Sequence, residues 1–464
     1  IRIWGWPGQE EYLEWAAEIS AKCFHVMRQY TNFPYPYTKS DQLGMPEFVA
    51  GAMENYGLII YKYQYITFNP KEGKFLVNTM QAALTADTNI TYSHPLYDVD
   101  GPFFDDITYK KGGSILRMIE TVLGKSVFQS ALQSYIRTYQ FSNADHEMLF
   151  EKFTEAAAGT VEDWCGRPMN VTRFLDPWFL QQDFPLVTVT NNQLISDATF
   201  SQQPYNDVER LPPNNTFGYT WPIPFYWKNY RYYYKNNETS LTWLTPAYET
   251  CAKSAIAPNN RAIHWDMGNA ESTSYLRVDY DDIGYTRLLE QLKARRDIDF
   301  STADKVHLIG DQLAIATERD RNGLPFSYHK VLDLITTILP KYPHYATFKI
   351  AQDFIDSMER LFMDGPDYEL FKAGIRRWLE ENYNILGYNT TGNWNNDMAR
   401  YLMLPYAVRY EAGTSAEEGL KLFNQFLVDC SNTTTVIDDC SQAGDRANFV
   451  NCEKKHNPAA TEEK

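Results

Sequence analysis

The hydrophobic period of this chain changes twice, and these changes constrain its fold more than any other feature. Apart from an extended stretch between Leu43 and Tyr65, the apolar residues before position 178 recur at helical spacing. Alternating segments such as Leu186–Thr190, Tyr219–Ile223 and Tyr275–Tyr280 then follow, separated by turn-forming residues. Near residue 285 the helical period returns. We therefore expect an α+β, multidomain fold with a strand-rich middle.

A chain of 464 residues is long enough for about three domains. The changes of period divide it into residues 1–178, a small β-sandwich over 179–280, and a C-terminal α-helical region over 281–464 that forms a stack of helical hairpins. In the first region the pattern predicts helices at Gln9–Tyr30, Lys74–Ala86, Lys110–Leu123, Ser126–Tyr139 and His146–Ala158. In the last region it predicts breaks at Asp299–Phe300, Gly323–Pro325, Pro340–Pro343, Gly365–Pro366 and Gly387–Gly392.

Charge and hydropathy exclude two kinds of partner. The net charge of -16 repels phosphate backbones and anionic lipid headgroups, so nucleic acid is not expected as a partner. No apolar run reaches the roughly 18 residues that a spanning helix needs, so no membrane-spanning segment is expected in this chain.

Six glycosylation acceptor triplets indicate an extracellular or cell-surface glycoprotein of the secretory pathway. Each is an Asn followed two residues later by Thr, at Asn89, Asn170, Asn214, Asn237, Asn389 and Asn432. The six cysteines are too sparse for a disulfide scaffold and lack zinc-ribbon spacing. In an oxidising compartment, Cys430 and Cys440 could close a small loop.

The stretch PEFVAGAMENYGLIIY, from Pro46 to Tyr61, resembles the exopeptidase segment of the aminopeptidase N family, zinc metallopeptidases of the gluzincin type. A second stretch, DDITYKKGGSILRM from Asp105 to Met118, resembles the segment that carries the catalytic tyrosine of this family. FPLVTV at Phe184–Val189 and YLRVDYDD at Tyr275–Asp282 resemble the two ends of the family's β-sandwich. The resemblance implies a thermolysin-like catalytic lobe over 1–178 and peptides with a free N-terminus as partners.

The resemblance also assigns roles to residues. Glu54 would hold the α-ammonium group of a peptide, with Gly51, Ala52, Met53 and Asn55 as the rest of the substrate-binding strand. Glycines there would let a peptide backbone approach and pair as an added strand. Tyr109 would donate its phenolic proton to the oxyanion of the transition state. Without the resemblance, the simpler interpretation is that Glu54 is a solvated acid on a strand edge and that Tyr109 is an ordinary aromatic residue.

The zinc site of the family is missing from this sequence. Such peptidases need two imidazoles one helical turn apart, with a glutamate as general base. None of the eight histidines is followed four residues later by another, and Phe150 stands where the partner of His146-Glu147 would fall. We interpret His146-Glu147 as the first turn of an ordinary helix. Tyr61–Gly73 resembles the family segment just before its zinc helices and Lys74–Thr88 resembles one well after them, so the resemblance implies that a block is missing between Gly73 and Lys74 and that the lobe is incomplete.

Three functions remain open on these grounds. The chain is a peptide-binding pseudoenzyme without zinc or any other cofactor, or it represents an active zinc aminopeptidase whose sequence is incomplete here. The third reading, a helical interaction module attached to a β-sandwich, ranks last because it leaves Glu54 and Tyr109 without a role.

Overall fold

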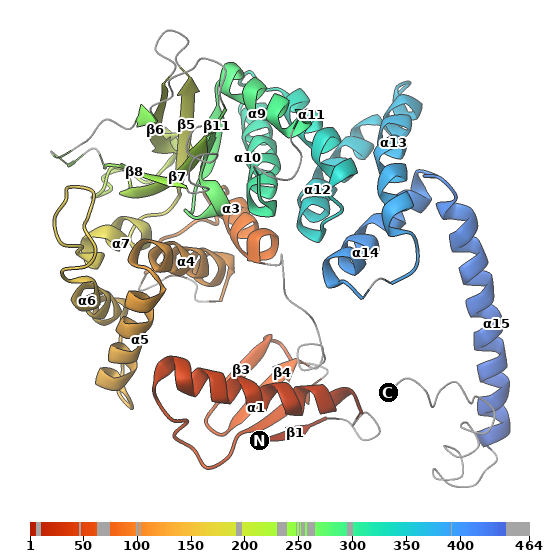
Figure 1. The fold of residues 1–464 in the computed structure, drawn as a ribbon, viewed down its shortest axis with the longest axis horizontal. Coiled ribbons are helices and arrows are strands. Elements are labelled where there is room, and N and C mark those ends of the chain that lie inside the picture. Colours follow the sequence, from red (N-terminus) through yellow and green to blue (C-terminus); the bar gives the residue numbers. More distant parts are fainter. Residues whose placement is uncertain are drawn as a thin grey trace. The chain divides into compact units, whose positions relative to one another are not determined.

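The structure is a computed structural model, and the chain divides into two compact units (Figure 1). Unit 1 comprises Ile1–Ile338 with Lys349–Phe354, and unit 2 comprises Leu339–Phe348 with Ile355–Lys464. The predicted domain boundaries at 178 and 280 are not tested by this division and stay a prediction. The structure describes residues 1–5, 11–45, 48–62, 75–98, 101, 104–191, 197–229, 239–246, 248–249, 251, 256–257, 265–294, 300–390 and 392–441.

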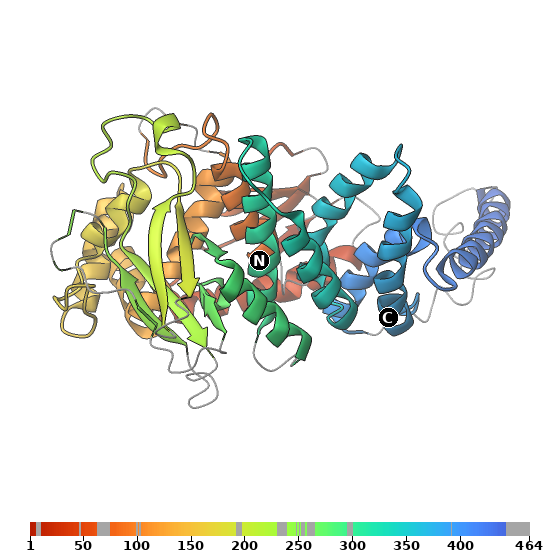
Figure 2. The same cartoon turned by 90° about the horizontal axis from the view of Figure 1, so that it is seen from above.

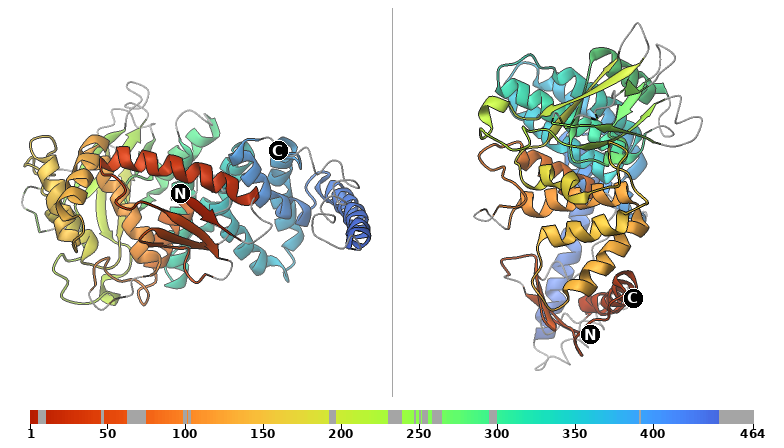
Figure 3. Two further views of the ribbon diagram at one scale, coloured as in Figure 1. Left: turned by 90° about the horizontal axis from the view of Figure 1, so that it is seen from below. Right: turned by 90° about the vertical axis from the view of Figure 1, so that its left-hand side faces the viewer.

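A four-stranded sheet and one long helix form the beginning of unit 1 (Figure 3). The strand order is β1-β2-β4-β3, and only β3 runs antiparallel to its neighbour. Helix α1 covers one face, where Leu13 and Ala16 are buried against Ile3 and Tyr61. The predicted helix over Gln9–Tyr30 is thereby confirmed. The elements are β1 (Arg2–Trp4), α1 (Glu11–Thr31), β2 (Asp41–Met45), β3 (Ala52–Asn55) and β4 (Leu58–Lys62).

Helices follow this sheet, and two of them open with a π-helical segment. Their apolar faces form a core that includes Ile115, Met118 and Ile119. The predicted helices are confirmed, whereas α7, which contains Pro177, was not predicted. The junction Gly73/Lys74 lies outside the described residues. The elements are η1 (Phe75–Gln81), α3 (Ala82–Asp87), η2 (Ile107–Lys111), α4 (Gly112–Leu123), α5 (Lys125–Tyr139), α6 (His146–Ala157) and α7 (Val171–Phe179).

Two sheets make up the strand-rich middle of the chain (Figure 2). Their orders are β11-β5-β6-β9 and β10-β7-β8, and they pack through Phe200, whose ring lies 4.8 Å from that of Phe225 and 5.9 Å from that of Trp227. The elements are β5 (Pro185–Asn191), β6 (Ala198–Pro204), η3 (Val208–Arg210), β7 (Ile223–Asn229), β8 (Ser240–Leu244), β9 (Ile256–Ala257), β10 (Asp266–Gly268), η4 (Ala270–Ser272) and β11 (Arg277–Tyr280).

The strand predicted over Tyr219–Ile223 is wrong, because β7 begins only at Ile223. Tyr219 has a left-handed backbone with φ 53°, and its hydroxyl donates to the carbonyl of Pro212 at 2.9 Å. Trp221 is wholly buried as well. The alternation of apolar residues therefore reflects a buried turn rather than a strand.

A buried polar cluster joins β11 to the helices beside it. Arg277 Nη1 lies 3.0 Å from an oxygen of Asp311 and donates to Gln81 of η1 at 3.0 Å. The other oxygen of Asp311 accepts from the backbone N–H of Val278 at 2.7 Å. The helices that complete unit 1 are α9 (Asp282–Ala294), α10 (Thr302–Arg321) and α11 (Tyr328–Ile338). This cluster fixes η1, β11 and α10 to one another.

Unit 2 is helical throughout its described part. Asn382 donates to the carbonyl of Leu339 at 2.9 Å, and the Tyr406 hydroxyl donates to Asp356 at 2.8 Å. Four of the five predicted breaks of the C-terminal region fall between helices, with Asp299 itself outside the described residues, whereas the break at Pro340–Pro343 overlaps the short 3-10 helix η5 (Leu339–Lys341). No helix in the described ranges is both long and apolar enough to cross a membrane. The other elements are α12 (Tyr345–Phe362, shared with unit 1), α13 (Tyr368–Leu386), α14 (Trp394–Arg409) and α15 (Ser415–Ser441).

Candidate functional site

Strand β3 contains Ala52, Met53, Glu54 and Asn55 and lies at the edge of its sheet. All four residues are exposed, and Gly51, just before the strand, accepts from the N–H of Lys62 through its carbonyl at 2.9 Å. Among the described strands, β4 alone pairs with β3, so the outer backbone groups of β3 face away from these strands. An edge of this kind can accept a further strand through main-chain hydrogen bonds.

The turn after β3 depends on Gly57. Its backbone has φ +70°, a left-handed conformation that a residue with a side chain seldom adopts. Its carbonyl accepts from the N–H of Asp41 of β2 at 2.9 Å. Gly57 therefore shapes the hairpin that presents Glu54.

Glu54 lies on the face of the sheet that α1 covers. Residues directly opposite one another on paired strands have their side chains on the same face of the sheet. Glu54 of β3 is opposite Ile59 of β4, and Ile59 is opposite Gln42 of β2, so all three side chains share one face. The Ser20 hydroxyl of α1 donates to Gln42 at 2.8 Å. On this face, burial raises the pKa of the Tyr61 phenol, with further contributions from Cys23 and the negative charge of Glu54. The exposed carboxylate is accessible to a cationic group.

Tyr109 lies in η2, a π-helical segment, and its side chain is 62% exposed. Its ring stacks on that of Phe104, with 6.4 Å between the centroids. Two residues later, Lys111 is wholly buried and anchors the segment. Short π-helical segments recur at functional sites because they turn a side chain away from the helical register. The phenol of Tyr109 is thereby presented to solvent.

Asp105 fixes the start of this segment. One of its carboxylate oxygens accepts from the N–H of Thr108 at 2.8 Å, and the other lies 2.7 Å from Nε2 of His94. Burial acts to raise the pKa of Asp105, but these two hydrogen bonds together hold it below its usual value. The second nitrogen of His94 lies 2.7 Å from the carbonyl of Pro95, so both ring nitrogens have partners.

The roles predicted for Glu54 and Tyr109 stay a prediction. No hydrogen bond, ion pair or ring contact joins Glu54 to Tyr109 among the described residues. The His146-Glu147 pair begins α6, as predicted, with Asp145 as the capping residue. Within the described ranges one group of side chains, Cys165, Glu249 and Cys251, has possible ligand atoms within 4.8 Å of one another. It contains no histidine, so these residues do not fit the zinc centre of a gluzincin.

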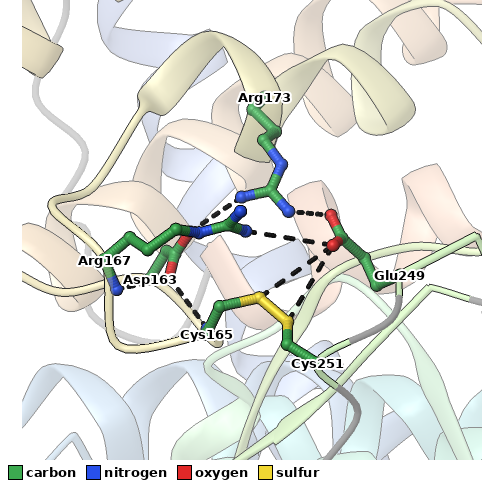
Figure 4. The surroundings of a disulfide bond; sticks show 6 residues. All are labelled: Asp163, Cys165, Arg167, Arg173, Glu249 and Cys251. Atoms are coloured by element: carbon green, nitrogen blue, oxygen red, sulfur yellow. Dashed lines mark hydrogen bonds and ion pairs between the residues drawn. A yellow bond between two sulfur atoms is a disulfide. The ribbon is translucent and has the colours of Figure 1, made fainter.

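The sulfurs of that group are joined in a disulfide, Cys165–Cys251, whose surroundings are shown in Figure 4. Arg173 pairs with Glu249 and lies 2.8 Å from Asp163. Asp163 in turn accepts from the backbone N–H of Cys165 at 2.8 Å. The bond and these ion pairs tie the loop before α7 to the segment after β8. The two cysteines are 86 positions apart, and no spacing signal in the sequence pairs them.

Four of the six predicted glycosylation asparagines, Asn89, Asn170, Asn214 and Asn389, have exposed side chains. Asn170 caps α7 by accepting from the N–H of Arg173 at 2.9 Å, and Asn89 accepts from the N–H of Thr91 at 3.1 Å. Asn237 lies outside the described residues, as does the side chain of Asn432. Modification at these positions stays a prediction.

A buried charge cluster was not foreseen from the sequence. The Nζ atom of Lys111 lies 2.9 Å from Asp87 and donates to the backbone carbonyl of Asp183 at 2.9 Å. Asp87 also accepts from the hydroxyls of Ser93 at 2.5 Å and Tyr275 at 3.2 Å. Lys111 follows Tyr109 by two residues, so this cluster holds η2 in place. The sequence offers no signal for it, because the partners come from four separate segments.

Two sequence models of known domains match this chain. The model described as the peptidase family M1 domain matches residues 15–86 and 72–178, and the ERAP1-like C-terminal domain matches residues 265–449. With the helical C-terminal region and the strand-rich region before it, these matches define a metallopeptidase class that acts on peptides. The chain belongs to peptidase family M1, the family of aminopeptidase N.

Several curated relatives agree with this assignment. The chain is 34% identical over 507 residues to the "Putative aminopeptidase-2" of Caenorhabditis elegans, 24% over 501 residues to the glutamyl aminopeptidase of Sus scrofa, and 25% over 521 residues to the aminopeptidase N of Mus musculus. These alignments cover 93%, 92% and 94% of this chain but 26%, 50% and 50% of the relatives. The chain therefore spans half or less of the length of these relatives.

Proposed function

We propose that this chain binds the amino-terminal end of peptides along β3 and does not hydrolyse them. The observation that carries this proposal is that Ala52–Asn55 form an exposed edge strand with the carboxylate of Glu54 on it. A peptide that pairs with β3 would gain main-chain hydrogen bonds, and its α-ammonium group would pair with Glu54.

The expected lack of hydrolysis follows from the metal ligands and the general base that the sequence lacks. Without two histidines one helical turn apart and the neighbouring glutamate, no metal-bound water of lowered pKa forms by the mechanism of this family. Tyr109 is a solvent-exposed donor that can stabilise an oxyanion but cannot generate a nucleophile. What these residues provide is recognition of the peptide terminus and, at Tyr109, a hydrogen-bond donor.

The test measures the affinity of a short peptide by calorimetry, with its α-amine free or acetylated. A hydrogen bond to a charged group contributes about 1.5–3 kcal/mol, so acetylation and Glu54→Gln should each weaken binding roughly tenfold or more. Glu147→Gln is the control, since Glu147 is an exposed glutamate on α6. If acetylation and Glu54→Gln both leave the affinity unchanged, β3 has no role in recognising the terminus.

Catalytic inactivity needs a separate measurement. We expect no stoichiometric zinc by metal analysis and no release of amino-terminal residues above background. Stoichiometric zinc together with release that a chelator abolishes would contradict the proposal.

A second candidate is an active zinc aminopeptidase of which this chain is an incomplete version. It is favoured by the alignments, which run over more residues than the 464 of the chain, so the relatives contain segments with no counterpart here. The family match is also split into 15–86 and 72–178, two ranges that overlap around the predicted junction. Reading the transcript across Gly73/Lys74 in the native source distinguishes the two candidates. A coding block for His-Glu-x-x-His at that point would favour the second.

We also propose that the chain is a glycoprotein of the secretory pathway. The exposed asparagines of four acceptor triplets and the Cys165–Cys251 disulfide support this, since such bonds persist in oxidising compartments. Treatment with a peptide N-glycosidase should lower the apparent mass of the protein from its native source. An unchanged mass would count against this location.

A further inference from the structure

The Cys165–Cys251 disulfide has a carboxylate placed evenly between its two sulfurs. Oε2 of Glu249 lies 3.9 Å from Sγ of Cys165 and 3.9 Å from Sγ of Cys251 (Figure 4). None of the three residues is fully buried, so a small solute can reach the sulfurs. Thiolate sulfur and carboxylate oxygen are both ligands of zinc in proteins. The three residues therefore offer a set of metal ligands, two of which are held in the disulfide.

The distances suit a tetrahedral metal ion once the disulfide is opened. With a metal–sulfur bond of about 2.3 Å and a metal–oxygen bond of about 2.0 Å, the two sulfurs lie about 3.8 Å apart and each lies about 3.5 Å from the oxygen. Glu249 already places its oxygen close to that separation from both sulfurs. The Cα atoms of the two cysteines are 5.6 Å apart, and the sulfurs can separate by rotation of the side chains.

Arginine side chains hold the carboxylate of Glu249 in this orientation. Arg173 pairs with its other oxygen, Oε1. Arg173 is itself fixed by Asp163 at 2.8 Å and by the ring of Trp164, whose centroid lies 4.7 Å from the guanidinium carbon. Oε2 has a longer contact, 3.9 Å to Arg167. Outer partners of this kind orient the ligands of metal sites, so Glu249 is preset to bind a metal through Oε2.

The charges around the sulfurs balance in two states of the cysteines. Two guanidinium groups face two carboxylates in this cluster, which consists of Arg167, Arg173, Asp163 and Glu249. A closed disulfide adds no charge, and a divalent cation bound to two thiolates adds none either. Two thiolates without a metal would leave two negative charges next to Glu249, which makes their ionisation costly. The surroundings therefore favour the disulfide or the metal-bound pair over free thiolates.

We propose that Cys165, Cys251 and Glu249 form a binding site for a thiophilic divalent cation, such as zinc or cadmium, when the disulfide is reduced. A thiol reductant supplies the two electrons and two protons, and two of its own thiol groups become a disulfide. The cation then displaces one proton from each cysteine, and both protons pass to water. A water molecule would complete the tetrahedron. This site is separate from the zinc centre of the family and does not depend on whether β3 binds peptides.

The first test uses the unchanged full chain. After reduction with dithiothreitol and desalting without oxygen, the protein is alkylated with iodoacetamide, with or without cadmium, and mass spectrometry follows each cysteine. Cadmium should slow the alkylation of Cys165 and Cys251 at least about tenfold, because a metal-bound sulfur is not a free nucleophile. Cys23, the exposed free cysteine, should stay reactive. Equal labelling of Cys165 and Cys251 with and without cadmium would overturn the proposal, as would equal protection of Cys23.

The second test examines the role of Glu249. The background carries serine at Cys23, Cys430, Cys440 and Cys452. In it the reduced chain should bind one equivalent of cadmium with a thiolate charge-transfer band in the ultraviolet, and the oxidised chain none. Glu249→Gln should weaken the affinity at least about tenfold. Glu209→Gln, at an exposed glutamate of η3, is the matched control and should not change it. The same band in the oxidised chain, or an unchanged affinity of the Glu249→Gln variant, would contradict the proposal.

Discussion

The ammonium group of Lys111 lies 2.9 Å from the carboxylate of Asp87, and both side chains are almost completely withdrawn from water. Removing one partner of such a pair leaves a charge buried without compensation, which costs about 3–5 kcal/mol. We therefore expect Lys111→Met to lower the free energy of unfolding of unit 1 by that amount, measured by urea titration of tryptophan fluorescence. Lys111→Met with Asp87→Leu should cost less than the single change. A loss below about 1 kcal/mol for the single variant would show that Asp87 finds another partner.

The pH dependence of stability should report on Asp183. Burial, aided by the negative charge of Asp87, raises the pKa of Asp183 to about 7, against about 3.9 in an unfolded chain. At a pH between these two pKa values, Asp183 is protonated in the folded protein and ionised in the unfolded chain. The contribution of Asp183 is thus fully present below about pH 4 and lost as the pH rises through about 7, with a slope of up to about 1.4 kcal/mol per pH unit.

Asp183→Asn removes this titration. Its stability should vary less between pH 4 and 7 than that of the unchanged chain, measured by calorimetric melting at a series of pH values. Parallel curves for the two proteins would show that Asp183 titrates alike in the folded and unfolded states.

The hairpin that presents Glu54 should be sensitive at Gly57. Because its φ is +70° while a Cβ would meet nothing closer than 3.5 Å, Gly57→Ala acts through backbone strain and should destabilise by about 1 kcal/mol. Gly113→Ala is a control with an expected effect of the opposite sign, since Gly113 lies in α4 with open space around it and no positive φ. That change should stabilise by about 0.5–1 kcal/mol. If both variants shift the unfolding midpoint in the same direction, the explanation from φ is wrong.

The Cys165–Cys251 disulfide should contribute through the loop that it closes. Replacing both cysteines by alanine should lower the free energy of unfolding by about 2–4 kcal/mol, because the unfolded chain regains freedom. Cys23→Ala, at an exposed free cysteine, should change nothing measurable. Equal denaturation midpoints for the double variant and the unchanged chain would mean that the disulfide adds no stability beyond that of the nearby ion pairs.

Local patterns predicted the elements that depend on local chemistry. The stripe of α1, the alternation of β5 and most breaks of the C-terminal region could be predicted, because each follows from a side-chain period or from Gly and Pro. The start of β7 was not, since Tyr219 and Trp221 are buried in a turn that alternates like a strand. Helix α7 was missed because it is short and contains proline.

The residues of the candidate site could be predicted from the sequence, but the secondary structure and the contacts around them could not. The stretch around Glu54 was recognisable by resemblance, while its position at a sheet edge depends on which strands pair across the chain. Similarly, Tyr109 was located, but the π-helical turn that exposes it is held by Lys111, Asp87 and Asp183. Contacts between residues so far apart in sequence leave no periodic signal in a single chain.

The disulfide has a practical consequence for handling this protein. A protease that cuts once anywhere between Cys165 and Cys251 yields two fragments that remain covalently joined. Such material would migrate near its full mass on a gel without reductant and separate into two bands only when a thiol is added. Purity judged under non-reducing conditions would therefore conceal a nick through the strand-rich region.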